Sequence, residues 1–332
     1  MEIRPINLDQ AVETWRQFET TGCLFPFQQY GYVAGFARQF CHSNDLLILS
    51  VELDQKPIAV LPLERQGKTA RLIGMKPVLG QEELTDYGDI VTARLDPATY
   101  AKLWQTAFQY LSGIGITGVW LDYVREDSQL FDHFRHHQQE TTKPQSVAPF
   151  IRLPSSWEVY LETLERTDRK ELKRKLKRLE TVPYWFDVGA VDRRGFDRFV
   201  TLHRRSDPNK EKFMSAAMVD YFWEMIGRPL GRWQFKLASL AIKDQPAAAI
   251  LYLSDGERAL LYNSGYDPAF GYYSSGLMLH ALLIKNNIAG GIKIHDFLRG
   301  NERYKYDLGA RDLNLYQISI NLVRLRGNAA GH

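Results

Sequence analysis

The segment Asp296–Leu308, DFLRGNERYKYDL, gathers ionisable and aromatic side chains behind an apolar strand predicted over Ile292–Leu298. A tyrosine such as Tyr304 can donate a proton, and a lysine such as Lys305 can hold a carboxylate or phosphate. The polar side chains that could face a substrate here are Asp296, Arg299, Glu302, Tyr304 and Lys305. Taken alone, the same residues also fit a solvated hairpin with internal ion pairs.

A second candidate site lies in GYDPAFGYYSSGLMLHALLI, residues 265–284, where a polar aromatic loop leads into an apolar helix predicted over Ser274–Asn287. A helix N-terminus presents free amides and a positive dipole, so it can bind phosphate. The residues at this helix start are Tyr273, Ser274, Ser275 and Gly276. The alternative is that Ser274 serves only as an N-cap.

Candidate bases occur in two other segments. In LTDYGD, Asp86 and Asp89 bracket a tyrosine and a glycine, and they could bind an amine or take a proton from it. Such carboxylates also commonly hydrogen-bond their own turn. His203, within a helix predicted over Asp192–Arg205, has an ordinary pKa near neutrality, but a lone helical histidine is more often packed or on the surface.

The stretch Arg166–Glu180, RTDRKELKRKLKRLE, is strongly basic. A stripe of its cations could meet tRNA, another anionic polymer or a nucleotide phosphate. Its interspersed acidic residues equally fit a solvated helix with internal salt bridges.

Composition restricts the class of protein. The chain has 332 residues and a formal net charge of +3, so it is not a nucleic-acid-binding polycation as a whole. Cys23 and Cys41 are too few for a disulfide scaffold or a four-cysteine zinc site, and they suit a reducing cytoplasm. The polar N-terminus predicts no signal peptide, and no apolar run is long enough for a membrane span. Phosphate-loop, dinucleotide-binding and hydrolase motifs are missing, which argues against those enzyme classes. No carboxylate–histidine motif frames His133, His136 and His137, so we expect no metal site.

Hydrophobic periodicity predicts an α+β protein with two domains of one type, over residues 1–145 and 146–332. Each half contains helices and then an antiparallel meander of strands. The predicted strands are 46–53, 58–63 and 69–75 in the first half, and 233–243, 247–254 and 259–265 in the second. Lys143–Ala148 is the predicted linker, and one long helix is predicted from Ser155 or Ser156 to Glu180. A last strand, Leu313–Leu322, could belong to either domain.

Several segments together resemble a known group of proteins. They are LFPFQQYGYVAGFARQF, IAVLPLER, APFIRLPSSWEVYLETLERTDRKELKRKLKRLE, GYDPAFGYYSSGLMLHALLI and IHDFLRGNERYKYDLGA. The combination resembles acyltransferases of the CelD/BcsL type in the GNAT superfamily. The layout is similar to that of the FemABX aminoacyl transferases.

The resemblance implies two tandem GNAT-like domains, each with a mixed, mostly antiparallel sheet flanked by helices. The first would be a degenerate copy on the acceptor side. The second would bind acyl-CoA, in the first instance acetyl-CoA, at residues 273–276. The resemblance implies an N-acyltransferase that acts on an amine of a sugar, a polysaccharide precursor or an amino acid. The alternatives are an aminoacyl-tRNA-dependent transferase of the FemABX kind and a non-catalytic binding protein in exopolysaccharide assembly.

The chemistry of acyl transfer then assigns expected roles. A base must neutralise the attacking amine, and an acid must protonate the leaving group. Asp86 is the expected base, with His203 as the second choice, and Tyr304 is the expected acid. Asp296 and Lys305 would hold the acceptor, together with Asp89, Arg299 and Glu302. The acceptor itself and the oligomeric state stay open.

Overall fold

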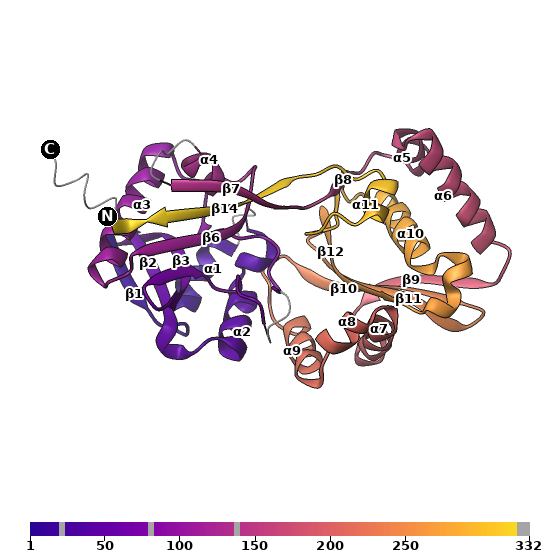
Figure 1. The fold of residues 1–332 in the computed structure, drawn as a ribbon, viewed down its shortest axis with the longest axis horizontal. Helices are drawn as coiled ribbons and strands as arrows, with labels where there is room; N and C mark the ends of the chain where they lie inside the picture. The colour runs from indigo at the N-terminus through magenta and orange to yellow at the C-terminus, as the bar shows by residue number, and fades with distance from the viewer. Residues whose placement is uncertain (20–23, 79–82, 136–139, 324–332) are drawn as a thin grey trace. The chain divides into compact units, whose positions relative to one another are not determined.

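The structure is a computed structural model that describes residues 1–19, 24–78, 83–135 and 140–323. The chain forms two compact units (Figure 1). The first unit comprises residues 1–146, 228–232 and 314–332, of which 324–332 lie outside the described residues. The second unit comprises residues 147–227 and 233–313.

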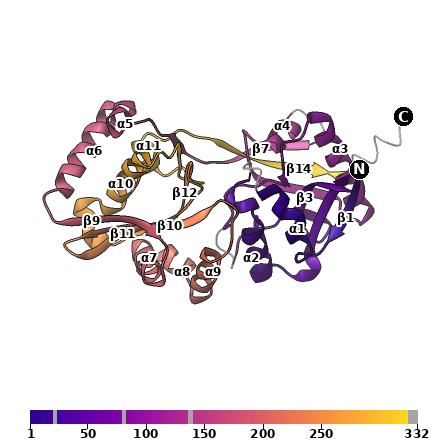
Figure 2. The ribbon, with the colours of Figure 1, turned by 180° about the vertical axis from the view of Figure 1, so that it is seen from behind.

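The first unit contains a mixed sheet with the strand order β1-β2-β3-β4-β6-β14-β7, and β5 also pairs with β3. Its strands are β1 (Glu2–Ile6), β2 (Leu46–Leu53), β3 (Lys56–Gln66), β4 (Thr69–Leu72), β5 (Val91–Thr92), β6 (Gly118–Arg125), β7 (Glu140–Val147) and β14 (Asn314–Asn321). Strands β1 to β4 pair antiparallel in sequence order, and β4 pairs parallel with β6. Helices α1 (Ala11–Glu19) and α2 (Tyr30–Phe40) cover one face, and α3 (Pro97–Gly113) and α4 (Gln129–Phe134) cover the other (Figures 1 and 2).

The second unit contains a sheet with the order β8-β13-β12-β11-β10-β9. Its strands are β8 (Phe150–Arg152), β9 (Tyr184–Ala190), β10 (Gln234–Ile242), β11 (Gln245–Ser254), β12 (Arg258–Tyr266) and β13 (Ile294–Asp296). Strands β9 to β12 pair antiparallel, whereas β12 and β13 are parallel.

Helices cover both faces of this second sheet (Figure 2). One face carries α5 (Trp157–Thr163), α6 (Arg166–Leu179), α10 (Ser275–Ala289) and α11 (Arg303–Asp307). The other carries α7 (Arg193–Ser206), α8 (Pro208–Phe213) and α9 (Ala216–Ile226). A 3-10 helix, η3 (Pro268–Tyr273), joins β12 to α10. Helix α10 is apolar nearly all round, and its buried side chains belong to the same core as those of α5, α6 and the sheet. This burial fixes where its N-terminus lies.

The predicted mixed α+β fold with two helix-flanked sheets is confirmed, including both antiparallel meanders. The predicted linker is wrong, because residues 143–147 belong to β7. Pro144 is tolerated there because β7 is an edge strand, where a missing N–H leaves no ladder bond unmade. The last strand, β14, pairs with β6 in the first sheet, so the range 146–332 is too long for the second domain.

Two local predictions are also wrong. The long helix expected up to Glu180 is broken between α5 and α6, where Leu164 and Glu165 are extended. Leu164 turns into the core and is only 4% exposed, so burial of its side chain overrides helix continuation. The solvated hairpin considered as the alternative after β13 is not found either: a turn on which the Lys305 side chain folds back is followed by the short helix α11.

Candidate active site

Strands β12 and β13 separate after a short parallel contact. They pair only from Arg258↔Ile294 to Leu260↔Asp296. Beyond Asp296 the chain turns away, and the Phe297 amide donates to the Pro149 carbonyl at 2.9 Å. Strand β12 continues to Tyr266 without a strand on that side among the described residues. An open strand edge of this kind can hydrogen-bond an extended ligand that contains amide groups.

The N-terminus of α10 follows this open edge and has no side-chain cap. Ser274, the N-cap residue, adopts a left-handed conformation (φ 54°), and its side chain caps no amide. The Ser275 hydroxyl is buried, yet it has no hydrogen-bond partner within the described parts of the chain. A Cβ at Gly276 would lie 3.3 Å from the Tyr266 ring, so a larger residue here would need a small shift of that ring. Free amides and an unpaired buried hydroxyl together fit an anionic ligand.

Helix α6 brings positive charge to the segment before this helix start. Its sequence, RTDRKELKRKLKRL, contains eight basic and two acidic residues. Arg178, near its C-terminal end, donates from Nη1 to the Tyr272 carbonyl oxygen at 2.9 Å, and its guanidinium lies 4.8 Å from the Tyr272 ring centroid. Within α6 only Glu171 pairs with cations, namely Arg174 and Lys175. The remaining basic side chains of the helix are therefore not neutralised by α6 itself.

The first unit lacks an equivalent anion site at the corresponding helix. Helix α3 lies between the parallel strands β4 and β6, as α10 lies between β12 and β13. Asp96 caps α3, and its carboxylate accepts hydrogen bonds from the amides of Ala98 and Thr99. These bonds, led by those from Thr99, lower the pKa of Asp96. A capped, negatively charged helix start repels a phosphate, which distinguishes α3 from α10.

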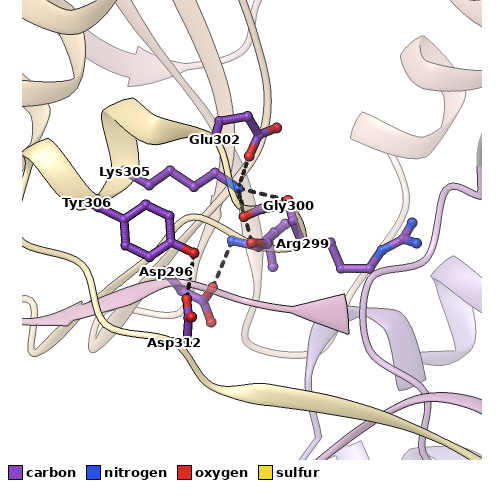
Figure 3. A network of polar contacts seen from close by, with 8 residues as sticks. Asp296, Arg299, Gly300, Glu302, Lys305, Tyr306 and Asp312 are labelled. Carbon is purple, nitrogen blue, oxygen red and sulfur yellow. Dashed lines mark hydrogen bonds and ion pairs between the residues drawn. The ribbon is translucent and has the colours of Figure 1, made fainter. Parts of the chain in front are cut away.

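Lys305 is buried and holds the turn after β13 (Figure 3). Its ammonium donates to the carbonyl oxygens of Leu298, Arg299 and Gly300 at 3.3, 2.8 and 3.0 Å. It also lies 2.9 Å from a carboxylate oxygen of Glu302, whose side chain is 59% exposed. The expectation that Lys305 binds the acceptor is therefore corrected, because these partners already use its donors. Its role is structural.

Asp296 has a similar local role. Its Oδ1 accepts from the Leu298 amide at 2.8 Å and fixes the turn in which Leu298 adopts a left-handed conformation (φ 57°). Figure 3 shows the Arg299 side chain extending away from Lys305 and Glu302. The structure thus brings Glu302 and Lys305 together and separates the Arg299 guanidinium from them. Arg299 is only partly buried, so it stays the acceptor-side candidate of this segment.

Tyr304 lies in α11 with its ring packed 4.8 Å from that of His280 and 6.1 Å from that of Phe297. Burial, with a smaller contribution from Glu302, raises the pKa of the Tyr304 hydroxyl above its ordinary value. The hydroxyl is therefore protonated at neutral pH. No hydrogen bond from it to another described residue is present, so it is free to donate to a substrate. This geometry suits the expected acid.

His203 does not suit the role of a base. It is 1% exposed, and its ring packs against those of Phe199 and Phe213. Burial, assisted by Lys210, lowers the pKa of His203 to about 3. Helix α7 and strand β12 approach closely and enclose His203: a Cβ at Gly265 of β12 would lie 2.2 Å from the His203 backbone nitrogen. The second-choice base is therefore corrected to a packed core histidine.

This burial predicts a pH dependence of stability. An unfolded histidine titrates near pH 6.5, whereas folded His203 stays neutral to about pH 3. Below pH 6.5 the unfolded state binds a proton that the folded state does not bind, so the free energy of unfolding falls as the pH falls. Between pH 7 and pH 5 this effect lowers the free energy of unfolding by up to about 2 kcal/mol, and we expect His203→Leu to abolish that part of the decrease. Urea unfolding of both proteins at the two pH values measures it; parallel pH slopes would contradict the assignment.

Asp86 and Asp89 belong to the first unit, while the other candidates belong to the second. Both aspartates are partly buried. Burial raises the pKa of Asp89 to about 7, opposed by a hydrogen bond from the Ile90 amide and by the charge of Arg125. A carboxyl group with a pKa near neutrality can exchange protons under physiological conditions. Asp89 therefore has a pKa suited to proton exchange, a property that the sequence did not indicate.

Three further residues lie at the candidate site and were not singled out from the sequence. Arg178 and Tyr272 lie far apart in the chain, and only packing of α6 on η3 brings them together. His280, behind Tyr304, is buried with its Nδ1 unpaired among the described residues, and burial lowers its pKa to about 3. The one sequence signal for His280 is its position in an otherwise apolar helix, one turn after Gly276.

Comparison with known proteins supports the class of the second unit. Residues 166–306 match the family model Acetyltransf_6, described as an acetyltransferase (GNAT) domain. No curated protein matches the chain.

Solved structures resemble the whole chain at low sequence identity. One is described as FemX, with a TM-score of 0.65, 10% identity and 99% of each chain covered. A second is the C-terminal domain of a putative lysylphosphatidylglycerol synthetase from Agrobacterium fabrum, with a TM-score of 0.56, 12% identity, and 96% of this chain and 95% of that chain covered. A third is a tandem GNAT protein from the clavulanic acid biosynthesis pathway, with a TM-score of 0.51, 12% identity, and 97% and 98% covered.

These findings show the fold of the chain and the type of domain that residues 166–306 match. Residues 166–306 form a GNAT-type domain, and the chain has the fold of tandem GNAT proteins. The family match and the tandem GNAT fold support an acyltransferase. In the described part of the chain, no helix is both long and apolar enough to cross a membrane. The same residues contain no group of histidine, cysteine and carboxylate side chains that could hold a metal ion.

Proposed function

We propose that this protein is an N-acyltransferase that moves an acyl group from acyl-CoA to an amine. The observation that carries the proposal is the uncapped N-terminus of α10, with its unpaired Ser275 hydroxyl, beside the open edge of β12. Coenzyme A matches both parts, because its pyrophosphate suits the helix start and its pantetheine amides suit the strand edge. Tyr273, Ser274, Ser275 and Gly276 are the donor-binding residues of this proposal.

The reaction forms an amide N–C bond and breaks the thioester C–S bond. The attacking amine loses a proton to a general base, a role for which Asp86 and Asp89 of the first unit remain the proposed candidates. The Tyr304 hydroxyl gives its proton to the departing thiolate and regains one from solvent. Arg299 and Glu302 contribute to acceptor binding. The resemblance to the CelD/BcsL type favours an acceptor in polysaccharide biosynthesis, acetyl-CoA as the donor and a cytoplasmic location.

The direct test is donor binding. We expect acetyl-CoA to stabilise the protein in thermal unfolding, by about 2.7 kcal/mol at a concentration of 100 times its Kd. Coenzyme A should stabilise it as well, and dephosphorylated pantetheine much less, because the phosphates bind the helix start. Equal stabilisation by pantetheine, or none by acetyl-CoA, would contradict the proposal.

Gly276→Asp tests the position of the phosphates. An aspartate in the first turn is compatible with helix α10, but its charge opposes an anionic ligand. We expect the Kd for acetyl-CoA to rise at least about tenfold, or about 1.4 kcal/mol. Gly276→Asn is the control because it has nearly the same size without the charge, so it separates repulsion from crowding against Tyr266. An equal loss of affinity in both variants would place the phosphates elsewhere.

The second candidate function uses aminoacyl-tRNA as the donor. One observation favours it: α6 contains eight basic residues and only two acidic ones, and six of the basic side chains have no acidic partner in the described chain. Such a surface suits a nucleic-acid backbone. Filter binding of charged tRNA at low and high salt, alongside the acetyl-CoA measurement, separates the two donors.

A further inference from the structure

A basic pocket lies on the opposite face of the second sheet from α10. It has a volume of about 720 Å³, within the range of small-molecule sites. One wall is a stripe of α7, and the other is formed by the start of β11 and by the loop that leads to η3. Its lining residues include Arg194, Arg198, Arg205, Gln245, Pro246 and Phe270.

The charges in this pocket are not balanced. Arg193 and Arg205 also line it, but each has an acidic partner, Asp197 at 3.0 Å and Asp267 at 2.8 Å. Arg194 and Arg198 are exposed and pair with no acidic group in the described chain. They are four residues apart on a helix, so their side chains lie on the same face. The four guanidiniums and the two carboxylates that line the pocket give it a net charge of +2.

We propose that this pocket binds an organic phosphate of nucleotide size, independently of the acyl donor. A phosphate monoester carries a charge of about −1.5 to −2 at pH 7, which matches the two unpaired guanidiniums better than a single carboxylate does. Arginine also binds phosphate oxygens in a bidentate geometry. The apolar surfaces of Pro246 and Phe270 can contact the flat base of such a nucleotide, and the Gln245 amide can hydrogen-bond the edge of that base.

The fold separates this pocket from the donor site. Helices α7 and α10 cover opposite faces of the sheet (Figures 1 and 2). The segment η3 lies between them, with Phe270 lining the pocket and Tyr272 held by Arg178 of α6. The two ligands can therefore occupy the second unit together.

Binding of AMP and UMP, measured by calorimetry, tests the proposal. We expect Arg194→Ala/Arg198→Ala to weaken nucleotide binding at least about tenfold, because two charge-assisted contacts are lost. Lys68→Ala/Lys102→Ala removes the same charge from exposed positions of the first unit and should leave the affinity unchanged. Adenosine and uridine, which lack phosphate, should bind at least about tenfold more weakly than their monophosphates.

Two outcomes would overturn the proposal: equal nucleotide affinity in the arginine variant and the parent, or equal loss in the lysine control. Competition with acetyl-CoA tests the independence of the site. We expect both ligands to bind together, and Gly276→Asp to weaken acetyl-CoA alone. Stoichiometric displacement of AMP by acetyl-CoA would make the pocket part of the donor site. Failure of acetyl-CoA to bind would contradict the proposed function but would leave the nucleotide result unaffected.

Discussion

Tyr304→Phe is expected to lower kcat by at least about 100-fold and to leave the Kd for acetyl-CoA within about twofold of the parent value. The substitution removes only the hydroxyl, which has no hydrogen-bond partner among the described residues and whose pKa is raised by burial. The ring contacts with His280 and Phe297 remain, so the fold should be unaffected. Steady-state kinetics with a reactive amine acceptor, together with donor binding, measure the effect.

Tyr306→Phe is the matched control for this prediction. Tyr306 lies in the same short helix, but its hydroxyl donates to Asp312 at 2.7 Å (Figure 3). Its loss should therefore change stability slightly and kcat by less than about twofold. If Tyr304→Phe retained full turnover, or if both variants lost activity equally, Tyr304 would not be the acid.

Lys305→Met is expected to lower the free energy of unfolding by about 2–3 kcal/mol, because the buried turn loses a charged hydrogen-bond donor. Methionine fills the space, but the carbonyl oxygens of Leu298, Arg299 and Gly300 lose their shared donor. The left-handed conformation of Leu298 would then be stabilised by the Asp296 hydrogen bond alone. Urea unfolding followed by far-ultraviolet circular dichroism measures the change.

Lys293→Met provides the comparison, since Lys293 is exposed and only its backbone is hydrogen-bonded in the described structure. We expect this control to change stability by less than about 0.5 kcal/mol. Lys305→Arg should recover little, because a planar guanidinium cannot reproduce three converging ammonium bonds in the same buried space. A loss below about 1 kcal/mol in Lys305→Met would show that the turn is held by its own backbone.

The sequence determined the class of fold and the identity of the helix that defines the candidate donor site. Short apolar runs bounded by turn residues marked β2 to β4 and β10 to β12, and β2, β3 and β11 bury consecutive side chains along most of their length. The apolar run after Ser274 marked α10 for the same reason, since a helix enclosed by other elements has few polar positions. These signals are local, so they can be read from the sequence without knowing which elements pack together.

Only the tertiary structure decided which polar groups are available for chemistry. Lys305, Asp296 and His203 have side-chain types common in active sites, yet packing gives each of them local partners or a buried environment. The sequence could not show that Lys305 folds back on Gly300, nor that β14 returns to the first sheet, because these contacts join residues through the shape of the whole chain. Desolvation likewise sets the pKa values of His203 and Asp89, and burial is a property of the assembled fold rather than of residue spacing.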